Sequence, residues 1–168
     1  MSFCLILLSA GESKRFNSKI PKPFIKIGGK TLLEHSLIKF SKIKEIKKIV
    51  VVINKKHLKF FKEITFKKIN MVVGGKTRQI STLKALKYIK KNRLKCNRVL
   101  IHDSARPNFS LKLIKRIIKV SGKKIVIPKI PIHDALKESI SNNILLNLPR
   151  ESFFSTQTPQ SFKFKQIL

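Results

Sequence analysis

The sequence predicts an α/β fold in which helices cover both faces of a mostly parallel β-sheet. Five short, largely apolar runs would form its strands, because unbroken apolar segments suit strands that are buried on both faces; they occupy residues 3–8, 48–53, 69–73, 98–102 and 124–128. Segments with apolar residues at helical spacing lie between several of these runs. We therefore expect a Rossmann-like, three-layer α/β/α domain with a mostly parallel sheet and a projecting β-arm.

The first run and the loop after it are central to this prediction. The polar segment at residues 12–23 is too long for a simple turn, and loops at the carboxyl ends of strands bind ligands in open α/β sheets. Gly11 lets the backbone approach a ligand closely, while Arg15 and Lys22 supply positive charge. Backbone N–H groups, a guanidinium and an ammonium together suit a polyphosphate. A surface loop with incidental basic residues is the alternative.

Two helices are expected next. Thr31 and Glu34 have the spacing of a capping box, which starts a helix that ends near Ser41. A shorter helix is expected around residues 57–61. His57 has no polar motif nearby and is expected at the surface.

A second glycine loop, Gly74 and Gly75, follows the third run and leads into a helix. Arg78 and Ser81 are three residues apart in its first turn and lie on one side of that helix. The N–H groups and the helix dipole at this end favour an anionic or carbonyl-bearing ligand, although an ordinary polar first turn fits these residues equally well. The apolar face of the helix is expected to consist of Ile80, Leu83, Leu86 and Ile89.

A carboxylate and a guanidinium follow the fourth run. Asp103 comes directly after the predicted strand, Arg106 lies three residues later, and Pro107 restrains the loop. Because Mg²⁺ binds proteins through one or two carboxylates together with phosphate oxygens, Asp103 is a candidate metal ligand. A purely structural Asp–Arg pair is the alternative.

The last third of the chain predicts an exposed arm. Residues 132–150 contain a polar turn between apolar stretches, which is typical of a β-hairpin. An exposed apolar hairpin requires a partner to cover it, so this arm is the candidate dimer contact; its apolar residues are Ile144, Leu145, Leu146 and Leu148. Ser161 could cap a final helix, but only seven residues follow it. We expect a single domain over residues 1–168 that is incomplete at its C-terminus.

The composition is strongly basic, with 38 Lys and Arg against 8 Asp and Glu, for a net charge of +30. Such a charge is typical of proteins that bind nucleic acid. However, the 38 basic residues less seven Arg leave 31 Lys, which are scattered along the whole chain. Aromatic residues are not interleaved with them as in base-stacking modules, so we expect no specific binding of nucleic acid. The few Arg are more informative, because a planar, multi-donor group is not replaceable by Lys.

The number of cysteines and the hydropathy of the sequence indicate where in the cell the protein is located. Only Cys4 and Cys96 occur, with no partner near either in the sequence, which fits free thiols in a reducing cytoplasm. No apolar run is long enough to span a membrane. The first eight residues lack the basic region of a signal peptide.

Six segments match one family in order and roughly in spacing: SAGESKRF, TLLEHSL, VVGGKTRQIS, HDSARP, PIHDALK and TQTPQ. The chain thereby resembles the 2-C-methyl-D-erythritol 4-phosphate cytidylyltransferases of the non-mevalonate isoprenoid pathway. The resemblance implies a cytoplasmic transferase that joins CTP to methylerythritol phosphate with release of pyrophosphate. It also implies Mg²⁺ as cofactor and a homodimer in which each arm reaches the neighbouring subunit.

The resemblance also implies roles for individual residues. Catalytic roles fall on Arg15, Lys22 and Arg150, the last of these acting in the partner's site. Nucleotide binding falls on Ala10, Gly11, Gly75, Arg78, Ser81 and Asp103, with Asp103 on the Mg²⁺ side. Substrate binding falls on Ser104, Arg106, Asp134 and Thr158, and the histidines His35, His102 and His133 are interpreted as structural residues or as residues that support those in contact with the ligand.

Two departures from the family keep alternatives open. Ala135 stands where the family usually has a Thr that contacts the substrate, so a ribitol 5-phosphate cytidylyltransferase or another sugar-phosphate nucleotidyltransferase is the second hypothesis. The family's last segment, with a further strand and phosphate-binding residues, has no counterpart before Leu168. We therefore expect the 168-residue polypeptide to be weakly active or inactive alone. A basic nucleic-acid-binding module and an inactive fragment are the non-enzyme alternatives.

Overall fold

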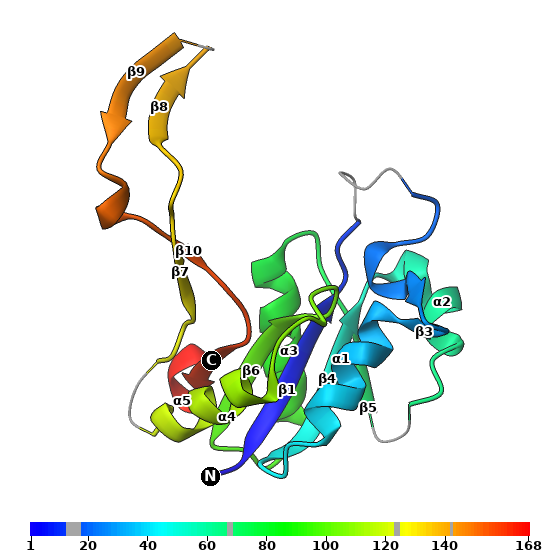
Figure 1. Ribbon diagram of the computed structural model, residues 1–168. Helices are drawn as coiled ribbons and strands as arrows, with labels where there is room; N and C mark the ends of the chain where they lie inside the picture. Colours follow the sequence, from blue (N-terminus) through cyan, green and yellow to red (C-terminus); the bar gives the residue numbers. More distant parts are fainter. Residues whose placement is uncertain (13–17, 67–68, 123–124, 142) are drawn as a thin grey trace.

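The computed structural model describes residues 1–12, 18–66, 69–122, 125–141 and 143–168. Within them, a five-stranded sheet lies between two layers of helices (Figure 1). The strand order is β11-β6-β1-β4-β5, and β11 alone in this sheet is antiparallel to its neighbour. This arrangement confirms the predicted three-layer, mostly parallel α/β/α fold. The strands are β1 Phe3–Ser9, β4 Ile46–Ile53, β5 Ile69–Val73, β6 Arg98–Asp103 and β11 Gln160–Lys163.

β1 is the centre of the sheet, because it pairs with both β4 and β6. Alternate residues of a strand face opposite sides of the sheet. Phe3, Leu5 and Leu7 accordingly pack on one side, against helices α1 (Leu32–Ser41) and α4 (Leu111–Val120). Cys4 and Ile6 pack on the other side, against α3 (Arg78–Lys91) and α5 (Phe164–Ile167). The first run is therefore buried on both faces, as its continuous apolar sequence predicts.

The helices begin where their capping residues predict. The Thr31 hydroxyl accepts from the Glu34 backbone N–H at 3.1 Å, and the Glu34 carboxylate accepts from the Thr31 N–H at 2.8 Å, so the predicted capping box is confirmed. Gly28 and Gly29 adopt left-handed φ values of 56° and 77° in the turn before it. None of the described helices is long and apolar enough to cross a membrane. The short elements nearby are η2 Lys22–Phe24, β2 Lys26–Ile27, β3 Lys30–Thr31, η3 Lys55–His57 and α2 Leu58–Lys62.

The predicted arm is confirmed as a two-stranded ribbon that projects from the body (Figure 1). It consists of β8 (Leu136–Ile140) and β9 (Asn143–Leu148). Its stem is the antiparallel pair of β7 (Lys129–Pro131) and β10 (Phe154–Thr156), with the short helix η4 (Arg150–Ser152) between β9 and β10.

The prediction of a strand over residues 124–128 is wrong for residues 125–128, which the structure describes. Only Val126 takes part in sheet pairing, through two backbone hydrogen bonds with Ser161. Neighbouring Ile125 and Ile127 are 58% and 43% exposed, so this segment lacks the cover that a buried strand requires. β11 takes the place beside β6 instead.

The expectation that Ser161 caps a final helix is also wrong. Ser161 lies within β11 and is fully buried, where its hydroxyl accepts from Arg98 Nε at 3.2 Å and shares a 2.8 Å hydrogen bond with the hydroxyl of Ser121. Arg98 is only 2% exposed and also donates to the carbonyl of Gly122 at 3.2 Å. The planar guanidinium thus bonds to two segments at once, which explains why an Arg occurs here in a lysine-rich chain.

The two cysteines lie closer together than the sequence suggests. Both are free thiols, and Cys4 shares a hydrogen bond with Cys96. This bond and burial raise the pKa of the Cys4 thiol, while the same bond lowers the pKa of Cys96.

His57 is buried, which corrects its expected surface position. Its ring lies edge-on to Phe24 at 6.2 Å between centroids, and its Nδ1 atom has no hydrogen-bond partner among the described residues. Burial lowers the pKa of His57 below the ordinary value of 6.5, despite the opposing charge of Glu12; nearby Lys56 also lowers it. Phe24 belongs to η2, so this contact with η2 contributes to the burial of the His57 ring.

Replacing His57 with Leu is expected to make the free energy of unfolding less dependent on pH. The folded-state pKa lies below that of the unfolded chain, so the unfolded state binds more protons as the pH falls through 6.5, and the wild type loses stability. At about pH 5.5 the variant should be more stable by about 1 kcal/mol, since it also removes an unpartnered polar atom. Urea unfolding at several pH values measures this effect. His133→Gln, at an exposed position, is the control and should retain the wild-type dependence.

Candidate active site

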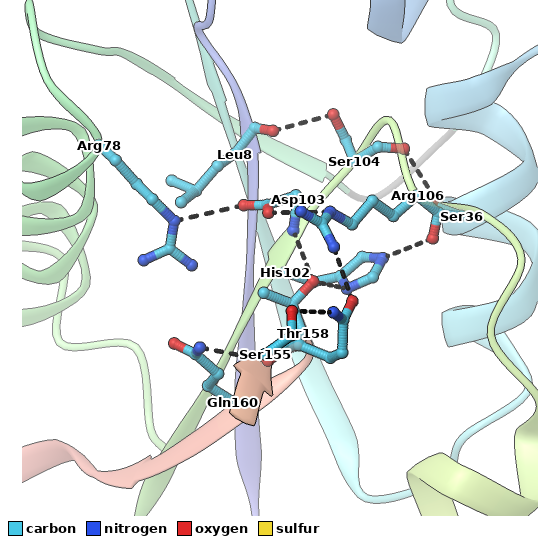
Figure 2. A network of polar contacts seen from close by, with 11 residues as sticks. Leu8, Ser36, Arg78, His102, Asp103, Ser104, Arg106, Ser155, Thr158 and Gln160 are labelled. Carbon is cyan, nitrogen blue, oxygen red and sulfur yellow. Dashed lines mark hydrogen bonds and ion pairs between the residues drawn. The ribbon is translucent and has the colours of Figure 1, made fainter. Parts of the chain in front are cut away.

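Three of the predicted loops converge at the carboxyl ends of the parallel strands. Asp103, the last residue of β6, forms ion pairs with two arginines from different segments (Figure 2). Its Oδ1 lies 3.3 Å from Arg78 Nε at the start of α3, and its Oδ2 lies 3.3 Å from Arg106 Nε in the following loop. The structure therefore brings together residues that are 25 positions apart in the sequence.

We call these three charged side chains the Asp103 group, and they are accessible to a ligand. The side chain of Asp103 is 31% exposed, and those of Arg78 and Arg106 are 46% and 54% exposed. Ion pairs between partly exposed groups contribute only about 0–1 kcal/mol each to stability. Stability alone is therefore a weak reason for placing two guanidinium groups and a carboxylate at this edge.

Helix α1 holds the loop that carries Arg106, a role that sequence patterns did not indicate. The hydroxyl of Ser36 donates to the carbonyl of Ser104 at 2.9 Å. Lys39 Nζ donates to the carbonyls of Pro107 and Phe109 at 2.8 and 3.1 Å. The spacing of Ser36 and Lys39, one helical turn apart, is the only sequence signal for this shared role.

His102 joins the Arg106 loop to Thr158. Its Nε2 lies 3.1 Å from the carbonyl oxygen of Arg106, and its Nδ1 lies 2.9 Å from Thr158 Oγ1. Burial lowers the pKa of His102 to about 4. The prediction that His102 is structural thus agrees with its burial, and the same contacts place Thr158 beside Asp103, whose N–H donates to Thr158 Oγ1 at 3.4 Å.

The second glycine loop is packed tightly against the first. A Cβ atom added to Gly74 would lie 2.6 Å from Cβ of Ala10 and 2.9 Å from Oγ of Ser81. Ser81 is 3% exposed, and its hydroxyl accepts from the Gly75 N–H at 3.1 Å. The hydroxyl of Ser81 therefore fixes the glycine loop instead of pointing into open space. Lys84, which the sequence did not single out, donates to the carbonyl of Gly74 at 2.9 Å.

Ser81 lies on the buried face of α3, so this face differs from the one that the sequence predicts. Ile80 and Leu83 are 42% and 40% exposed, so the expectation that they face the core is wrong. The buried side chains lie at helical spacing from Ser81; they are Ser81, Ala85, Leu86 and Ile89.

Replacing Gly74 with Ala is expected to weaken the predicted nucleotide binding by up to about 100-fold, the cost of an ångström-scale misplacement in a preorganised site. The added methyl would push Ala10 and the glycine loop apart, because a 2.6 Å contact between carbon atoms is not tolerated. Calorimetric titration with CTP and Mg²⁺ measures the change. Gly122→Ala adds a methyl that meets no atom of the described part of the chain within 4 Å, and it should leave the affinity unchanged. Equal affinities for both variants would contradict the packing argument.

The other predicted residues of the nucleotide side lie in the first loop and the short helix that follows it. Arg15 lies outside the described residues. Lys22 begins η2, which packs on α1 at the same end of the sheet (Figure 1). Gly11 follows the β1 strand, and an added Cβ would meet no atom of the described residues within 4 Å.

Ser104 and two arm residues do not face the Asp103 group. Ser104 is fully buried, and its hydroxyl donates to the carbonyl of Leu8 at 2.9 Å and accepts from Ser9 at 2.6 Å. Asp134 is exposed in the arm. Arg150 lies at the base of the hairpin, where it donates to the carbonyl of His133 at 2.8 Å. The chain therefore does not bring its own Arg150 to its own Asp103.

The residues present fit a magnesium ion that is bound together with a phosphate ligand. The described residues contain no cluster of three or more His, Cys, Asp or Glu side chains suited to a metal ion. Mg²⁺ does not require one, since it commonly uses one or two carboxylates and completes its shell with water and phosphate oxygens. The partly exposed Asp103 carboxylate supplies that ligand.

Two cavities lie away from the Asp103 group. One of about 270 Å³ is at the amino ends of the strands, lined by residues that include Met1, Arg98 and Phe164. The other, about 200 Å³, is lined by residues including His35, Lys39 and Pro107. Neither cavity is lined by Asp103, Arg78 or Arg106. We therefore assign the site to the carboxyl edge of the sheet, where these three side chains meet.

A charged group at the carboxyl edge of a parallel sheet, next to two glycine loops, places the chain in the class of α/β proteins that bind nucleotides or related anions. Residues 3–168 match the IspD family, described as 2-C-methyl-D-erythritol 4-phosphate cytidylyltransferase. The chain belongs to this family.

Individual relatives support the same assignment. The chain is 48% identical to the bifunctional enzyme IspD/IspF of Pelagibacter ubique, over 99% of this chain and 44% of that protein. It is 38% identical to a 2-C-methyl-D-erythritol 4-phosphate cytidylyltransferase of Thermosipho melanesiensis, over 95% of this chain and 72% of the relative. The structure of a 4-diphosphocytidyl-2C-methyl-D-erythritol synthase from Anaerococcus prevotii is similar, with a TM-score of 0.79, 29% identity, and coverage of 98% of this chain and 72% of that one. The chain thus spans less than half of the bifunctional relative and nearly three quarters of the other two.

Proposed function

We propose that the chain carries out, or contributes most of the site for, the transfer of a cytidylyl group from CTP to 2-C-methyl-D-erythritol 4-phosphate, with release of pyrophosphate. The observation that carries this proposal is the convergence of Asp103 with Arg78 and Arg106 at the carboxyl edge of the sheet, in a member of this family. The free thiols and the lack of a membrane-spanning helix among the described elements are compatible with a cytoplasmic location.

The chemistry explains why charged side chains dominate the site. The attacking group is a phosphomonoester, which is largely dianionic at neutral pH because its second pKa is about 6. It therefore requires no general base. It does require that two anions be held in line and that the charge of the reacting phosphoryl group be balanced, which is the usual demand of phosphoryl transfer.

We assign the residues to two sides of the site. The nucleotide side would comprise Ala10, Gly11, Gly75, Arg78 and Ser81, with Ser81 acting by fixing the Gly75 backbone. Arg15 and Lys22 would bind phosphate oxygens. Bound Mg²⁺ would neutralise phosphate charge, and Asp103 would hold it. The polyol phosphate would lie near Arg106 and Thr158, which border the same group.

We also propose a homodimer through the arm. Ile140 and Leu146 in the hairpin are 62% and 47% exposed, and large exposed apolar side chains favour a protein contact. Arg150 lies at the base of this hairpin and not beside Asp103 of its own chain. In a twofold dimer, each arm would bring Arg150, and with it Asp134, to the site of the neighbouring subunit.

The proposed reaction is tested by incubating the chain with CTP, Mg²⁺ and a panel of polyol phosphates. The expected result is slow pyrophosphate release with methylerythritol phosphate, together with a product of the corresponding mass. Ribitol 5-phosphate is the informative alternative substrate. Ala135 lacks the hydroxyl with which a Thr at this position would contact methylerythritol phosphate, so the preference for that substrate is the point to be tested. Turnover of ribitol 5-phosphate alone would replace the proposed substrate, and absence of CTP binding at millimolar concentration would contradict the proposed function.

A further inference from the structure

We propose that His102 is a positioning residue that makes Thr158 an acceptor of hydrogen bonds, so that Thr158 binds a donor group of the ligand, such as a hydroxyl of the polyol. The inference rests on the proposed function for the identity of the ligand. Its basis in the protein is the set of contacts around the imidazole ring, which Figure 2 shows between the strand β6 and the segment that carries Thr158.

The imidazole ring of His102 is held in one orientation. It is fully buried and packs edge-on against two aromatic rings, those of Phe40 at 5.2 Å and Phe109 at 4.9 Å between centroids. These rings also contact each other at 4.5 Å. Because Phe40 belongs to α1 and Phe109 lies in the loop after Arg106, the ring cannot rotate without disturbing two elements.

The partners of the two ring nitrogens determine where the proton resides. Nε2 faces the backbone carbonyl of Arg106 at 3.1 Å, and a carbonyl oxygen can only accept a hydrogen bond, so Nε2 carries the proton. The ring is fully buried between two phenyl rings, where the charged imidazolium is unfavourable, so the ring is neutral and Nδ1 is an acceptor. The Thr158 hydroxyl, 2.9 Å from Nδ1, must therefore donate to it.

This assignment determines which further hydrogen bonds the Thr158 hydroxyl can form. A hydroxyl has one proton and two lone pairs. The proton is used by His102, and one lone pair faces the N–H of Asp103 at 3.4 Å. What remains is an acceptor, which suits a hydroxyl of a polyol or a ribose and does not suit a phosphate oxygen. The same ring that sets this polarity also holds the Arg106 backbone.

The proton assignment can be tested without any assay of activity. Two-bond ¹H–¹⁵N spectra of the imidazole rings at about pH 7.5 distinguish the two neutral tautomers and the imidazolium form, and comparison with His102→Gln assigns the signals. The expected result is the Nε2–H tautomer, with an Nδ1 resonance that shifts in Thr158→Val. An Nδ1–H tautomer, an imidazolium, or an unchanged Nδ1 resonance in Thr158→Val would overturn the proposal.

The functional part is tested by a double-mutant cycle between His102→Gln and Thr158→Val, with the affinity for the polyol phosphate as the readout. Gln keeps a donor near Nε2, and its one acceptor, the amide oxygen, does not occupy the position of Nδ1, so Thr158 loses its partner there. Each change should weaken the affinity about tenfold, and the double variant should be no weaker than either single one, because all three lack the same hydrogen bond. Thr158→Ser retains the hydroxyl and should restore most of the affinity.

The outcomes separate the two proposals. Independent, multiplicative losses in the cycle would overturn the role of His102, as would a Thr158→Ser variant that binds no better than Thr158→Val. An unaltered unfolding midpoint in Thr158→Val, measured alongside, excludes a general loss of structure. If the wild type shows the Nε2–H tautomer yet binds no polyol phosphate, the proposed function is wrong and the assigned polarity of Thr158 stands.

Discussion

Replacement of Asp103 by Asn should lower cytidylyl transfer by about 10²–10³-fold, the loss seen when one preorganised electrostatic group is removed from a transition state. The carboxylate is the only side chain that contacts both Arg78 and Arg106 among the described residues, and it is the proposed ligand of Mg²⁺. Its removal therefore changes the charge and the geometry of the site together. The initial rate of pyrophosphate release measures the effect.

Stability should change little in this variant. The three side chains are between 31% and 54% exposed, so the lost ion pairs contribute about 1 kcal/mol or less each. Glu63→Gln makes the same change of charge at an exposed position in the cap of α2 and should retain full activity. Equal losses in both variants would show that net charge, and not the Asp103 group, determines the rate.

Binding of CTP adds a further signature of the Asp103→Asn variant. In the presence of Mg²⁺ it should bind CTP more weakly than the wild type, because the proposed metal ligand is absent. Without Mg²⁺ it should bind CTP more tightly, because a negative charge has been removed from the site and Arg78 is released from its ion pair. A variant that binds more weakly in both conditions would contradict Asp103 as the metal-side carboxylate.

A mixture of two inactive variants should regain activity if the arms cross between subunits. Arg150→Ala is expected to be nearly inactive because it removes the proposed phosphate contact in the partner's site. When it is mixed with Asp103→Asn, half of the dimers are hybrids, and each hybrid has one intact site, composed of the body of one chain and the arm of the other. The mixture should therefore reach about a quarter of the wild-type rate.

The matched control for this experiment is a mixture of Asp103→Asn with Arg106→Ala. Both residues belong to the same group in one chain, so no hybrid has an intact site and no activity should return. Recovery in this control, or no recovery in the Arg150 mixture despite subunit exchange, would contradict the crossed-arm dimer. Mass measurement of differently labelled subunits confirms the exchange.

Much of the central fold could be predicted from local sequence patterns. The first run is apolar at every position and lies at the middle of the sheet, where both faces are covered. Thr31 and Glu34 identified the start of α1 because the capping box is a local interaction. Asp103 and Arg106 were recognised because the end of a strand and a turn are visible in the chain itself.

The errors occurred where distant contacts decide the outcome. Residues 125–128 have the composition of a strand, yet β11 takes the position beside β6. His57 has no distinctive neighbours in the sequence but packs against Phe24, which lies far from it in the chain. Ser36 and Lys39 appeared to be ordinary helix residues, and only the folded chain shows that they bind the loop of Arg106.

A crystal structure of the chain with CTP and Mg²⁺ tests the central claim most directly. The account predicts CTP at the carboxyl edge of the sheet, beside the backbone of Gly11 and Gly75, with the metal ion held by the Asp103 carboxylate. A nucleotide bound in the cavity near Arg98 at the opposite end, with the Asp103 group unchanged, would contradict it.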